Sequence, residues 1–226
     1  MISIKNIATR VAKKISETKK RKKLAQYEGR LISKSKGDDQ YKDYLRLQLH
    51  RTITKKKDHS SSKQEYLINL LQERVELTGL KVLCIGCRSI EEINYFKKAK
   101  AGNTVGIDLF SEDKEILVMD MHDMTFNNNC FDVIFSCHSL EHAQDYNRAI
   151  SESIRVAKKE AIFVIEVPVN YETRGADIWD FKSIDHIKSL FQPYIKEILL
   201  EEYSTKGSDN NFAGTDVARV IFQIAK

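Results

Sequence analysis

Cysteine is scarce in this chain, and long apolar runs are missing from it. The cysteines are Cys84, Cys87, Cys130 and Cys137. Four cysteines in 226 residues are too few for a disulfide-stabilised scaffold, and free thiols are typical of a reducing compartment. No apolar stretch approaches the ~18 residues of a membrane span, and lysines interrupt the N-terminal segment where a secretory signal would have its apolar core. We therefore expect a cytoplasmic protein.

Cys84 and Cys87 form a C-x-x-C pair, but the partners that would make it a metal or redox site are missing. A zinc site would need a second C-x-x-C or a spaced pair of histidines. A redox pair would begin in the first turn of a helix, whereas Cys84 lies inside an apolar run that predicts a buried strand. We interpret both cysteines as small apolar side chains of the core and expect no metal.

The net charge of +5 conceals two segments of opposite sign. Residues 1–60 carry 18 Lys and Arg against six Asp and Glu, a net charge of +12. The remaining residues carry 19 against 26, a net charge of −7. We therefore divide the chain into a basic helical N-terminal arm with a polar linker, residues 1–60, and an α/β domain, residues 61–226.

Helical patterns fill most of the basic arm. Apolar side chains recur at helical spacing from Ile4 to Ile15 among many lysines, and a second short helix is predicted over residues 41–51. Such an arm can pack on the protein core or on a partner, lie on an anionic membrane, or grip a nucleic-acid backbone. Aromatic side chains that would stack on bases are not interleaved with the lysines. We place packing or a partner first, a peripheral membrane contact second and nucleic acid third.

Alternating strand and helix patterns predict an α/β fold for the rest of the chain. Near-continuous apolar runs, typical of strands buried on both faces, occupy residues 81–86, 104–110, 116–121, 131–137 and 161–169. Helical patterns occupy residues 63–79, 90–100, 143–157 and 183–191. Two last strand patterns, residues 196–204 and 217–225, predict an antiparallel pair joined by a long polar loop. The alternation indicates an open parallel sheet with helices on both faces.

One connection is too short for a complete crossover. About five residues separate the second run, residues 104–110, from the third, residues 116–121, although a parallel crossover usually needs about a dozen. We expect either a third strand that is only a stub or a crossover helix reduced to a turn.

Glycine is missing where a nucleotide-binding turn would have it. In the segment VLCIGCRSIEE, residues 82–92, Gly86 ends a strand pattern, but Arg88 and Ile90 stand where two further glycines are expected. Asp108 ends the next strand pattern 22 residues after Gly86, where such folds place the carboxylate that binds the ribose hydroxyls. The alternatives for Asp108 are a helix N-cap and a solvent-exposed strand end. Ligands bind outside the carboxyl ends of parallel strands, so the candidate stretches are residues 86–90, 108–110, 120–122 and 137–142.

Four motifs in order resemble the class I S-adenosylmethionine-dependent methyltransferases, particularly their small-molecule branch. The motifs are VLCIGC, VGIDLF, MDMHDMTFNNNCFDVIFSCHSLEHA and RVAKKEAIFVIEVPV. The resemblance covers residues 80–225. It implies a Rossmann-like sheet of seven strands, mostly parallel with the last strand antiparallel, and S-adenosylmethionine as the cofactor.

The resemblance also implies roles for individual residues. Gly86 would be the turn glycine beside the methionine end of the donor, and Asp108 the ribose acid. Asp120 and Met121 would flank the adenine, and Cys137 would face the sulfonium. The implied cofactor contacts are Gly86, Cys87, Arg88, Asp108, Leu109, Asp120, Met121 and Cys137.

The chain departs from the family at the glycine turn. An acid is usual where Cys84 stands, and Arg88 and Ile90 replace glycines. We hypothesise that the guanidinium of Arg88 binds the carboxylate of the donor; the alternative is that it points to solvent. Ser89 is expected to cap the following helix, with Glu92 as its capping-box partner.

Two histidines are the candidate bases for methyl transfer to an acceptor hydroxyl. His138 lies directly after the fourth strand pattern and is the preferred base. His142, in the segment SLEH, is the second candidate and could instead cap or orient a loop, and both histidines could be structural. The candidates for contact with the acceptor are Asn170, Tyr171, Arg174 and Trp179. Ordinary packing is the alternative for the tryptophan.

These features favour a methyltransferase that uses S-adenosylmethionine and acts on a small-molecule or saccharide-type acceptor. An RNA methyltransferase that docks through its basic arm is one alternative. A methyltransferase-fold protein that binds or regulates without catalysis is another. The lost glycines favour the non-catalytic alternative, whereas Asp108, Asp120 and the segment around His138 favour catalysis.

Overall fold

The chain divides into two compact units, Met1–Lys57 and Asp58–Lys226. The computed structural model describes residues 17–19, 21–22, 24–29, 32, 37–54, 61–173 and 177–226. The division falls within the polar segment that follows the basic helices, where few apolar side chains are available to pack.

The first unit is helical in the part that the structure describes. Helical residues occur between positions 17 and 32, and α2 (Asp39–Thr54) follows them. Near the start of α2, Asp38 Oδ1 accepts the backbone N–H of Tyr41 at 2.8 Å and so satisfies one donor of the first turn. The predicted second helix is therefore confirmed. The apolar stripe from Ile4 to Ile15 lies outside the described residues.

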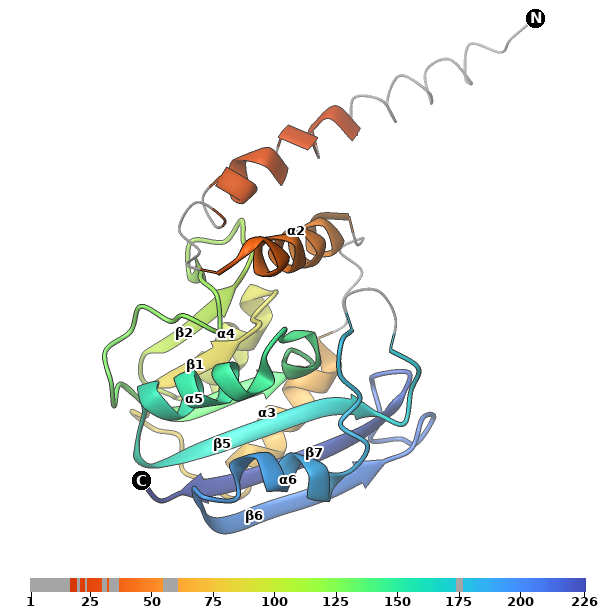
Figure 1. Cartoon of the computed structure of the whole chain (residues 1–226). Helices are drawn as coiled ribbons and strands as arrows, with labels where there is room; N and C mark the ends of the chain where they lie inside the picture. Colours follow the sequence, from red (N-terminus) through yellow and green to blue (C-terminus); the bar gives the residue numbers. More distant parts are fainter. Residues whose placement is uncertain are drawn as a thin grey trace, which may run out of the picture. The chain divides into compact units, whose positions relative to one another are not determined.

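The second unit is built on a seven-stranded sheet (Figure 1). Its strands are β1 (Val82–Ile85), β2 (Thr104–Asp108), β3 (Ile116–Val118), β4 (Phe131–Cys137), β5 (Ala157–Val169), β6 (Ile195–Ser204) and β7 (Asp216–Ile224). They lie in the order β3-β2-β1-β4-β5-β7-β6. Neighbours from β3 to β5 pair in parallel, and β7 runs antiparallel to both β5 and β6. The expected Rossmann-like sheet with an antiparallel last strand is confirmed.

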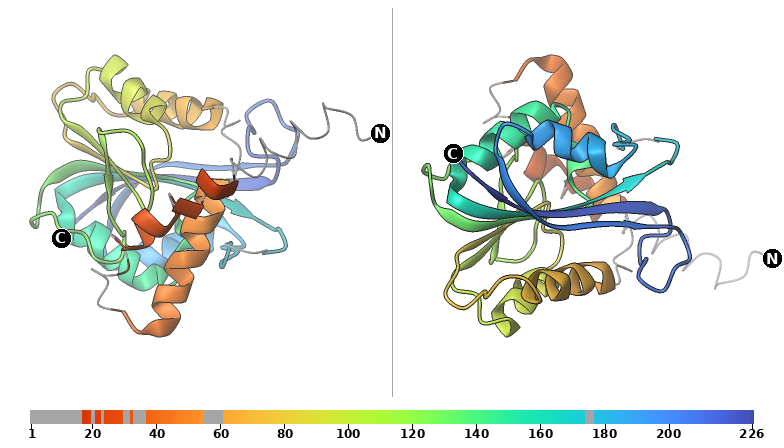
Figure 2. Two further views of the ribbon diagram at one scale, coloured as in Figure 1. Left: turned by 90° about the horizontal axis from the view of Figure 1, so that it is seen from above. Right: turned by 90° about the horizontal axis from the view of Figure 1, so that it is seen from below.

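Helices cover both faces of the sheet (Figure 2). On one face lie α3 (Ser62–Gln72) and α4 (Ile90–Lys98), and on the other α5 (Tyr146–Val156) and α6 (Ile184–Phe191). A side-chain cap starts α5, because Asp145 Oδ1 accepts the backbone N–H of Arg148 at 3.0 Å. Among the described helices, none combines the length and the apolar character that crossing a membrane requires.

Each face of the sheet has its own apolar core. Under α5 and α6, the rings of Phe163, Phe191 and Phe222 pack with their centroids 5.1–5.5 Å apart. Under α3 and α4, the ring of Phe96 meets that of Phe135 edge to face at 5.2 Å. The middle strands β4 and β5 are buried along most of their length, which is why their sequences read as continuous apolar runs.

Two element boundaries depend on irregular backbone. β3 has three residues, and residues 109–115 connect it to β2 without a helix. The third strand is therefore a stub and its crossover a turn, as the short connection required. β5 begins at Ala157 rather than at residue 161, through a stretch with a register shift in which Glu160 has a φ of 63°.

Candidate functional site

The turn after β1 is fixed by close packing against the segment after β4. Gly86 has a φ of 71°, and a Cβ there would lie 2.3 Å from Ser139 Cβ. The Ser139 hydroxyl donates to the Ile85 carbonyl at 2.9 Å and bonds with the Ser136 hydroxyl at 2.7 Å. Glycine is therefore required at position 86 by the backbone conformation and by the neighbouring serine.

The helix after this turn begins as expected, but one acid points elsewhere. Ser89 caps α4, because its hydroxyl accepts the backbone N–H of Glu91 at 3.2 Å. Glu92, expected to complete a capping box, is buried with 3% of its surface exposed, and its carboxyl faces Gln64 and Cys87. Burial, and then the charge of Asp108, raise the pKa of Glu92 to about 8.

Two carboxylates end neighbouring parallel strands beside the turn. Asp108 is the last residue of β2; its Oδ1 accepts the backbone N–H of Phe110 at 3.1 Å, and its carbonyl accepts that of Met119 at 3.0 Å. Asp120 follows β3, where its Oδ1 accepts both the backbone N–H of His122 at 2.9 Å and a bond from its ring Nδ1 at 2.7 Å. The fold thus brings together the two acids predicted to bind ribose and adenine.

The charges of Arg88 and His142 both act on Asp108. Burial raises the pKa of Asp108, and the backbone N–H of Phe110 and the charges of Arg88 and His142 oppose that shift. The guanidinium of Arg88 therefore lies in the neighbourhood of the predicted ribose acid. The backbone N–H of Cys87 donates to the Ile107 carbonyl of β2 at 2.9 Å. This N–H of the turn is therefore already used within the sheet.

His138 lies at the end of β4 between two carboxylates. Its backbone has a φ of 54°, and its ring Nε2 is 2.9 Å from Glu166 Oε1. Its ring Nδ1 is 3.7 Å from Glu141 Oε1. The preferred candidate base is thus oriented by a buried acid of the next strand, which the sequence analysis did not identify.

The acid that orients His138 belongs to a buried polar row across three strands. Glu166 on β5 pairs with Arg219 on β7, and both side chains are fully buried. Arg219 also pairs with Glu202 on β6 and stacks over the ring of Tyr66 at 4.9 Å. Burial would raise the pKa of Glu166, but His138 and Arg219 outweigh it and lower that pKa. In the sequence, the only sign of this row is a charged residue inside an apolar run: Glu166 within residues 161–169 and Arg219 within residues 217–225.

A second pair of carboxylates flanks His142. Its ring Nδ1 is 3.1 Å from Asp177 Oδ1, and its ring Nε2 is 3.9 Å from Glu141 Oε1. Glu141 lies in the 3₁₀ turn η1 (Leu140–His142), and its carbonyl accepts the backbone N–H groups of Ile178 at 2.9 Å and Trp179 at 3.1 Å. The structure therefore adds Glu141 and Asp177 to the predicted histidines.

Three of the predicted acceptor contacts, in the segment after β5, form hydrogen bonds within the protein. The Trp179 indole donates to the Ala143 carbonyl at 2.6 Å and packs edge to face on Tyr146 at 4.8 Å. The Tyr171 hydroxyl donates to the Trp179 carbonyl at 3.1 Å, and the Asn170 amide donates to the Tyr203 hydroxyl at 2.9 Å. Arg174 lies outside the described residues. Trp179 thus anchors this segment to the start of α5.

The cysteines at the site are buried thiols. Cys84 and Cys87 are 0% exposed. Burial raises the pKa of Cys84, and a hydrogen bond with Cys84 together with burial raises that of Cys87. Cys137 has its pKa raised by burial and then by the charge of Glu166. These thiols stay protonated at neutral pH, as expected of small core side chains.

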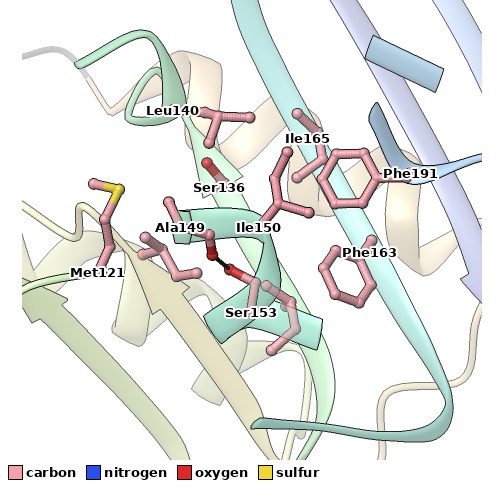
Figure 3. A pocket seen from close by; sticks show the side chains of 11 residues that line it. Met121, Ser136, Leu140, Ala149, Ile150, Ser153, Phe163, Ile165 and Phe191 are labelled. Atoms are coloured by element: carbon pink, nitrogen blue, oxygen red, sulfur yellow. Dashed lines mark hydrogen bonds between the residues drawn. The ribbon is translucent and has the colours of Figure 1, made fainter. Parts of the chain in front are cut away.

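A small cavity lies under α5, and Met121, one of the predicted cofactor contacts, is part of its lining (Figure 3). Its volume of about 10 Å³ is close to the space of one water molecule. Its lining is apolar apart from Ser136 and Ser153, and both hydroxyls already bond within the protein, to Ser139 and to the Ala149 carbonyl. This cavity is a packing gap that is too small for a nucleoside, and the candidate ligand site remains the carboxyl edge of the sheet.

The residues at the strand ends indicate the class of protein to which the chain belongs. Gly86, Asp108, Asp120 and His138 follow four adjacent parallel strands of an open α/β sheet. Such a sheet binds its ligand outside these strand ends, where the connections leave in opposite directions from the middle of the sheet. The protein therefore belongs to the open α/β class, and its candidate ligand site lies at this edge.

Comparisons with known proteins narrow the class. A family model for a methyltransferase domain matches residues 83–165. The structure of a Burkholderia thailandensis 1,6-didemethyltoxoflavin-N1-methyltransferase with bound 1,6-didemethyltoxoflavin and S-adenosylhomocysteine is similar, with 12% identity and a TM-score of 0.59, over 75% of this chain and 80% of that chain. An Aquifex aeolicus SAM-dependent methyltransferase has 16% identity and a TM-score of 0.54, over 74% and 95%. The [4+2]-cyclase SpnF has 16% identity and a TM-score of 0.57, over 71% and 80%. A search of curated proteins gave no match.

The second unit has the fold of the class I S-adenosylmethionine-dependent methyltransferases, and the resemblance seen in the sequence is confirmed. The matched segment contains Gly86, Asp108, Asp120 and His138. The comparisons support S-adenosylmethionine as the cofactor. The residues present fit this group, because a glycine turn and two carboxylates oriented by backbone donors stand at adjacent strand ends.

Proposed function

We propose that this protein is a methyltransferase that transfers the methyl group of S-adenosylmethionine to a small-molecule or saccharide-type acceptor. One observation supports this proposal most directly. Asp108 and Asp120 end adjacent parallel strands beside the Gly86 turn, and both carboxylates are oriented by backbone N–H groups. Two acids in this arrangement suit vicinal hydroxyls and an exocyclic amine better than they suit a phosphate.

The residues that would hold the donor follow from this arrangement. Asp108 would accept hydrogen bonds from the ribose hydroxyls, with Leu109 beside it, and Asp120 would accept one from the adenine amine, with Met121 against the ring. Gly86, Cys87 and Arg88 would surround the methionine end, and Cys137 would face the sulfur. When bound, S-adenosylmethionine supplies a methyl group on a positively charged sulfur.

The remaining residues would orient the acceptor and accept the proton that it loses. Most of the acceleration of a methyl transfer comes from holding the two reactants in line. His138 and His142 are the proposed acid–base groups, and Glu166 and Asp177 orient their rings at 2.9 and 3.1 Å. The small-molecule methyltransferase of B. thailandensis supports an acceptor of this size.

Calorimetry on the full chain with S-adenosylmethionine and S-adenosylhomocysteine tests the donor site. We expect both to bind, and Asp108→Asn to weaken each by about tenfold or more, because the ribose hydroxyls lose a charged acceptor. Asp113→Asn is the matched control, since Asp113 lies in the connection to β3 and accepts the backbone N–H of Glu115. Absence of binding at millimolar ligand would favour the non-catalytic alternative. Equal affinities for the two variants would refute the ribose role.

A further inference from the structure

Acids and imidazoles alternate along the carboxyl edge of β4. Glu166 Oε1 is 2.9 Å from His138 Nε2, and His138 Nδ1 is 3.7 Å from Glu141 Oε1. That oxygen is 3.9 Å from His142 Nε2, and His142 Nδ1 is 3.1 Å from Asp177 Oδ1. We name these five side chains the acid–imidazole row. Glu141 is its centre, and its carboxylate faces both histidines through one oxygen.

The second oxygen of Glu141 is the unexplained feature of the row. The Glu141 side chain is 3% exposed, and its Oε2 is buried with no hydrogen-bond partner among the described residues. A buried carboxylate oxygen without a donor costs free energy, so such groups are rare, and a bound water, a ligand or a catalytic role accounts for them. Glu141 Oε1 faces the histidines, which leaves Oε2 for a donor from outside the chain.

The backbone holds Glu141 firmly in place. Its carbonyl accepts two backbone N–H groups, those of Ile178 and Trp179, at 2.9 and 3.1 Å. Ser139, two residues earlier, donates to the Ile85 carbonyl at 2.9 Å beside the Gly86 turn. These contacts fix the backbone of Glu141 at the strand edge that holds the predicted donor residues.

The charges of the row restrict what can bind there. The row contains three acids and two histidines, and the charge of His142 also acts on Asp108. No three His, Cys, Asp or Glu side chains in the described part of the chain converge as metal ligands would. A carboxylate group of an acceptor has no hydrogen to donate to Glu141 Oε2, whereas a hydroxyl or an amine supplies the missing hydrogen-bond donor.

We propose that Glu141 is the acceptor-binding carboxylate of this site, and that its Oε2 accepts the hydrogen bond and then the proton of an acceptor hydroxyl or amine. This inference rests on the proposed function. The acceptor oxygen or nitrogen forms a bond to the methyl carbon, and the carbon–sulfur bond breaks with its electron pair left on sulfur. The O–H or N–H proton passes to Glu141, and the histidines with Asp177 lead it toward solvent. His138 and His142 keep their proposed acid–base role by taking this proton on from Glu141, whose Oε1 faces them at 3.7 and 3.9 Å.

Two small probes of equal size test the assignment on the full chain. Ethanolamine offers a hydroxyl and an ammonium, whereas acetate offers a carboxylate, and each has four non-hydrogen atoms. We expect ethanolamine, and not acetate, to shift the imidazole resonances of His138 and His142 in NMR titrations with and without S-adenosylhomocysteine. Glu141→Gln should weaken ethanolamine binding by about tenfold or more, and Glu160→Gln, on the exposed surface of β5, should leave it unchanged.

Glu141→Asp separates a chemical role from a structural one. It keeps a carboxylate, so we expect it to retain part of the ethanolamine binding that Glu141→Gln loses. Equal binding by wild type and Glu141→Gln, acetate binding as tightly as ethanolamine, or no response from either probe would overturn the assignment. Calorimetry with S-adenosylhomocysteine on the same samples tests the proposed function independently: binding that is unaltered in Glu141→Gln leaves that proposal standing, whichever way the probes behave.

Discussion

At the scale of single residues, each position of the turn after β1 has its own structural requirement, which a glycine motif alone does not reveal. Gly86 is needed because its φ is positive and because Ser139 occupies the space of a side chain. Cys87 commits its backbone N–H to the Ile107 carbonyl. Arg88 is the next residue able to offer donors to an anionic ligand, and its charge acts on Asp108. A turn with a single glycine can therefore still serve a ligand if a side chain replaces the lost amides.

Gly86→Ala should destabilise the protein more than Gly214→Ala. Both positions have a positive φ, 71° and 76°, which costs an alanine about 1–2 kcal/mol. Only Gly86 adds a collision, with Ser139 Cβ at 2.3 Å, whereas nothing lies within 4 Å of a Cβ at Gly214. Chemical denaturation monitored by circular dichroism compares the two variants. Equal losses of unfolding free energy would show that the Ser139 contact relaxes without cost.

Arg88→Ala should weaken the binding of S-adenosylhomocysteine by about tenfold or more, because a charge-assisted pair with the ligand carboxylate is lost. Arg88→Lys should retain part of the affinity, since it keeps the charge without the planar fork. Arg148→Ala, on α5, is the control for a general loss of positive charge. Calorimetric affinities that match the wild type would eliminate the carboxylate role of Arg88.

At the scale of elements, the helices and strands around the site are joined by buried polar groups. The row of Glu166, Arg219 and Glu202 crosses β5, β7 and β6 and ends at His138. On the opposite side of the turn, α4 inserts Glu92 into the core beside Gln64 of α3. Buried ionisable groups of this kind rarely add stability over apolar ones, so their retention indicates a requirement for position or for charge.

Glu92→Gln should change how stability depends on pH. The folded-state pKa of Glu92 is raised from 4.5 to about 8, so the folded protein binds one proton more than the unfolded chain between these values. Its contribution to the unfolding free energy therefore falls as pH rises from about 4.5 to about 8 and is constant above that. Gln cannot ionise, so the variant should lose this decline.

Urea denaturation at pH 5 and at pH 8.5 measures the difference. We expect the variant to gain stability relative to the wild type at pH 8.5 and little or nothing at pH 5. Glu91→Gln, the exposed neighbour in the same helical turn, is the control. A constant difference between Glu92→Gln and wild type across this range would mean that the Glu92 carboxyl does not titrate in it.

At the scale of the whole molecule, charge separates the two units of the chain. Residues 1–60 carry +12 and the remainder −7, whereas the site itself is lined by acids. The basic arm therefore has the sign to meet an anionic surface. The small apolar stripe of the arm favours a surface that can take up apolar side chains.

Sedimentation of the full chain with vesicles that contain phosphatidylserine, against filter binding to a single-stranded RNA, tests the arm. Of these two surfaces, which rank behind packing or a protein partner, we expect the vesicles rather than the RNA to bind, and that binding to fall between low and high salt, because the lysines act through screened charge. A variant with Lys13, Lys14, Lys19 and Lys20 replaced by Gln should release the vesicles. RNA binding with a steep salt dependence would restore the RNA alternative, and binding to neither would favour packing or a protein partner.

The sequence by itself determined the class of this protein. Apolar runs such as residues 131–137 and helical patterns such as residues 183–191 depend on local periodicity, so the order of elements could be predicted from them. The seven-stranded sheet followed from the family resemblance. The spacing from Gly86 to Asp108 likewise located the carboxyl edge of the sheet, where the candidate site lies. The start of β5 was missed because residues 157–160 are polar and join the sheet through an irregular register.

Only the tertiary structure decided which side chains meet at that edge. Glu166 lies 28 residues beyond His138 and on the neighbouring strand, and Asp177 reaches His142 from a loop after β5. The burial of the Glu92 side chain could not be predicted from the sequence either, because the spacing of Glu92 from Ser89 fits a capping box. Periodicity records which face of an element is apolar, whereas the pairing of charged groups depends on strand register and loop path. Those are set by packing between segments that are distant in the chain.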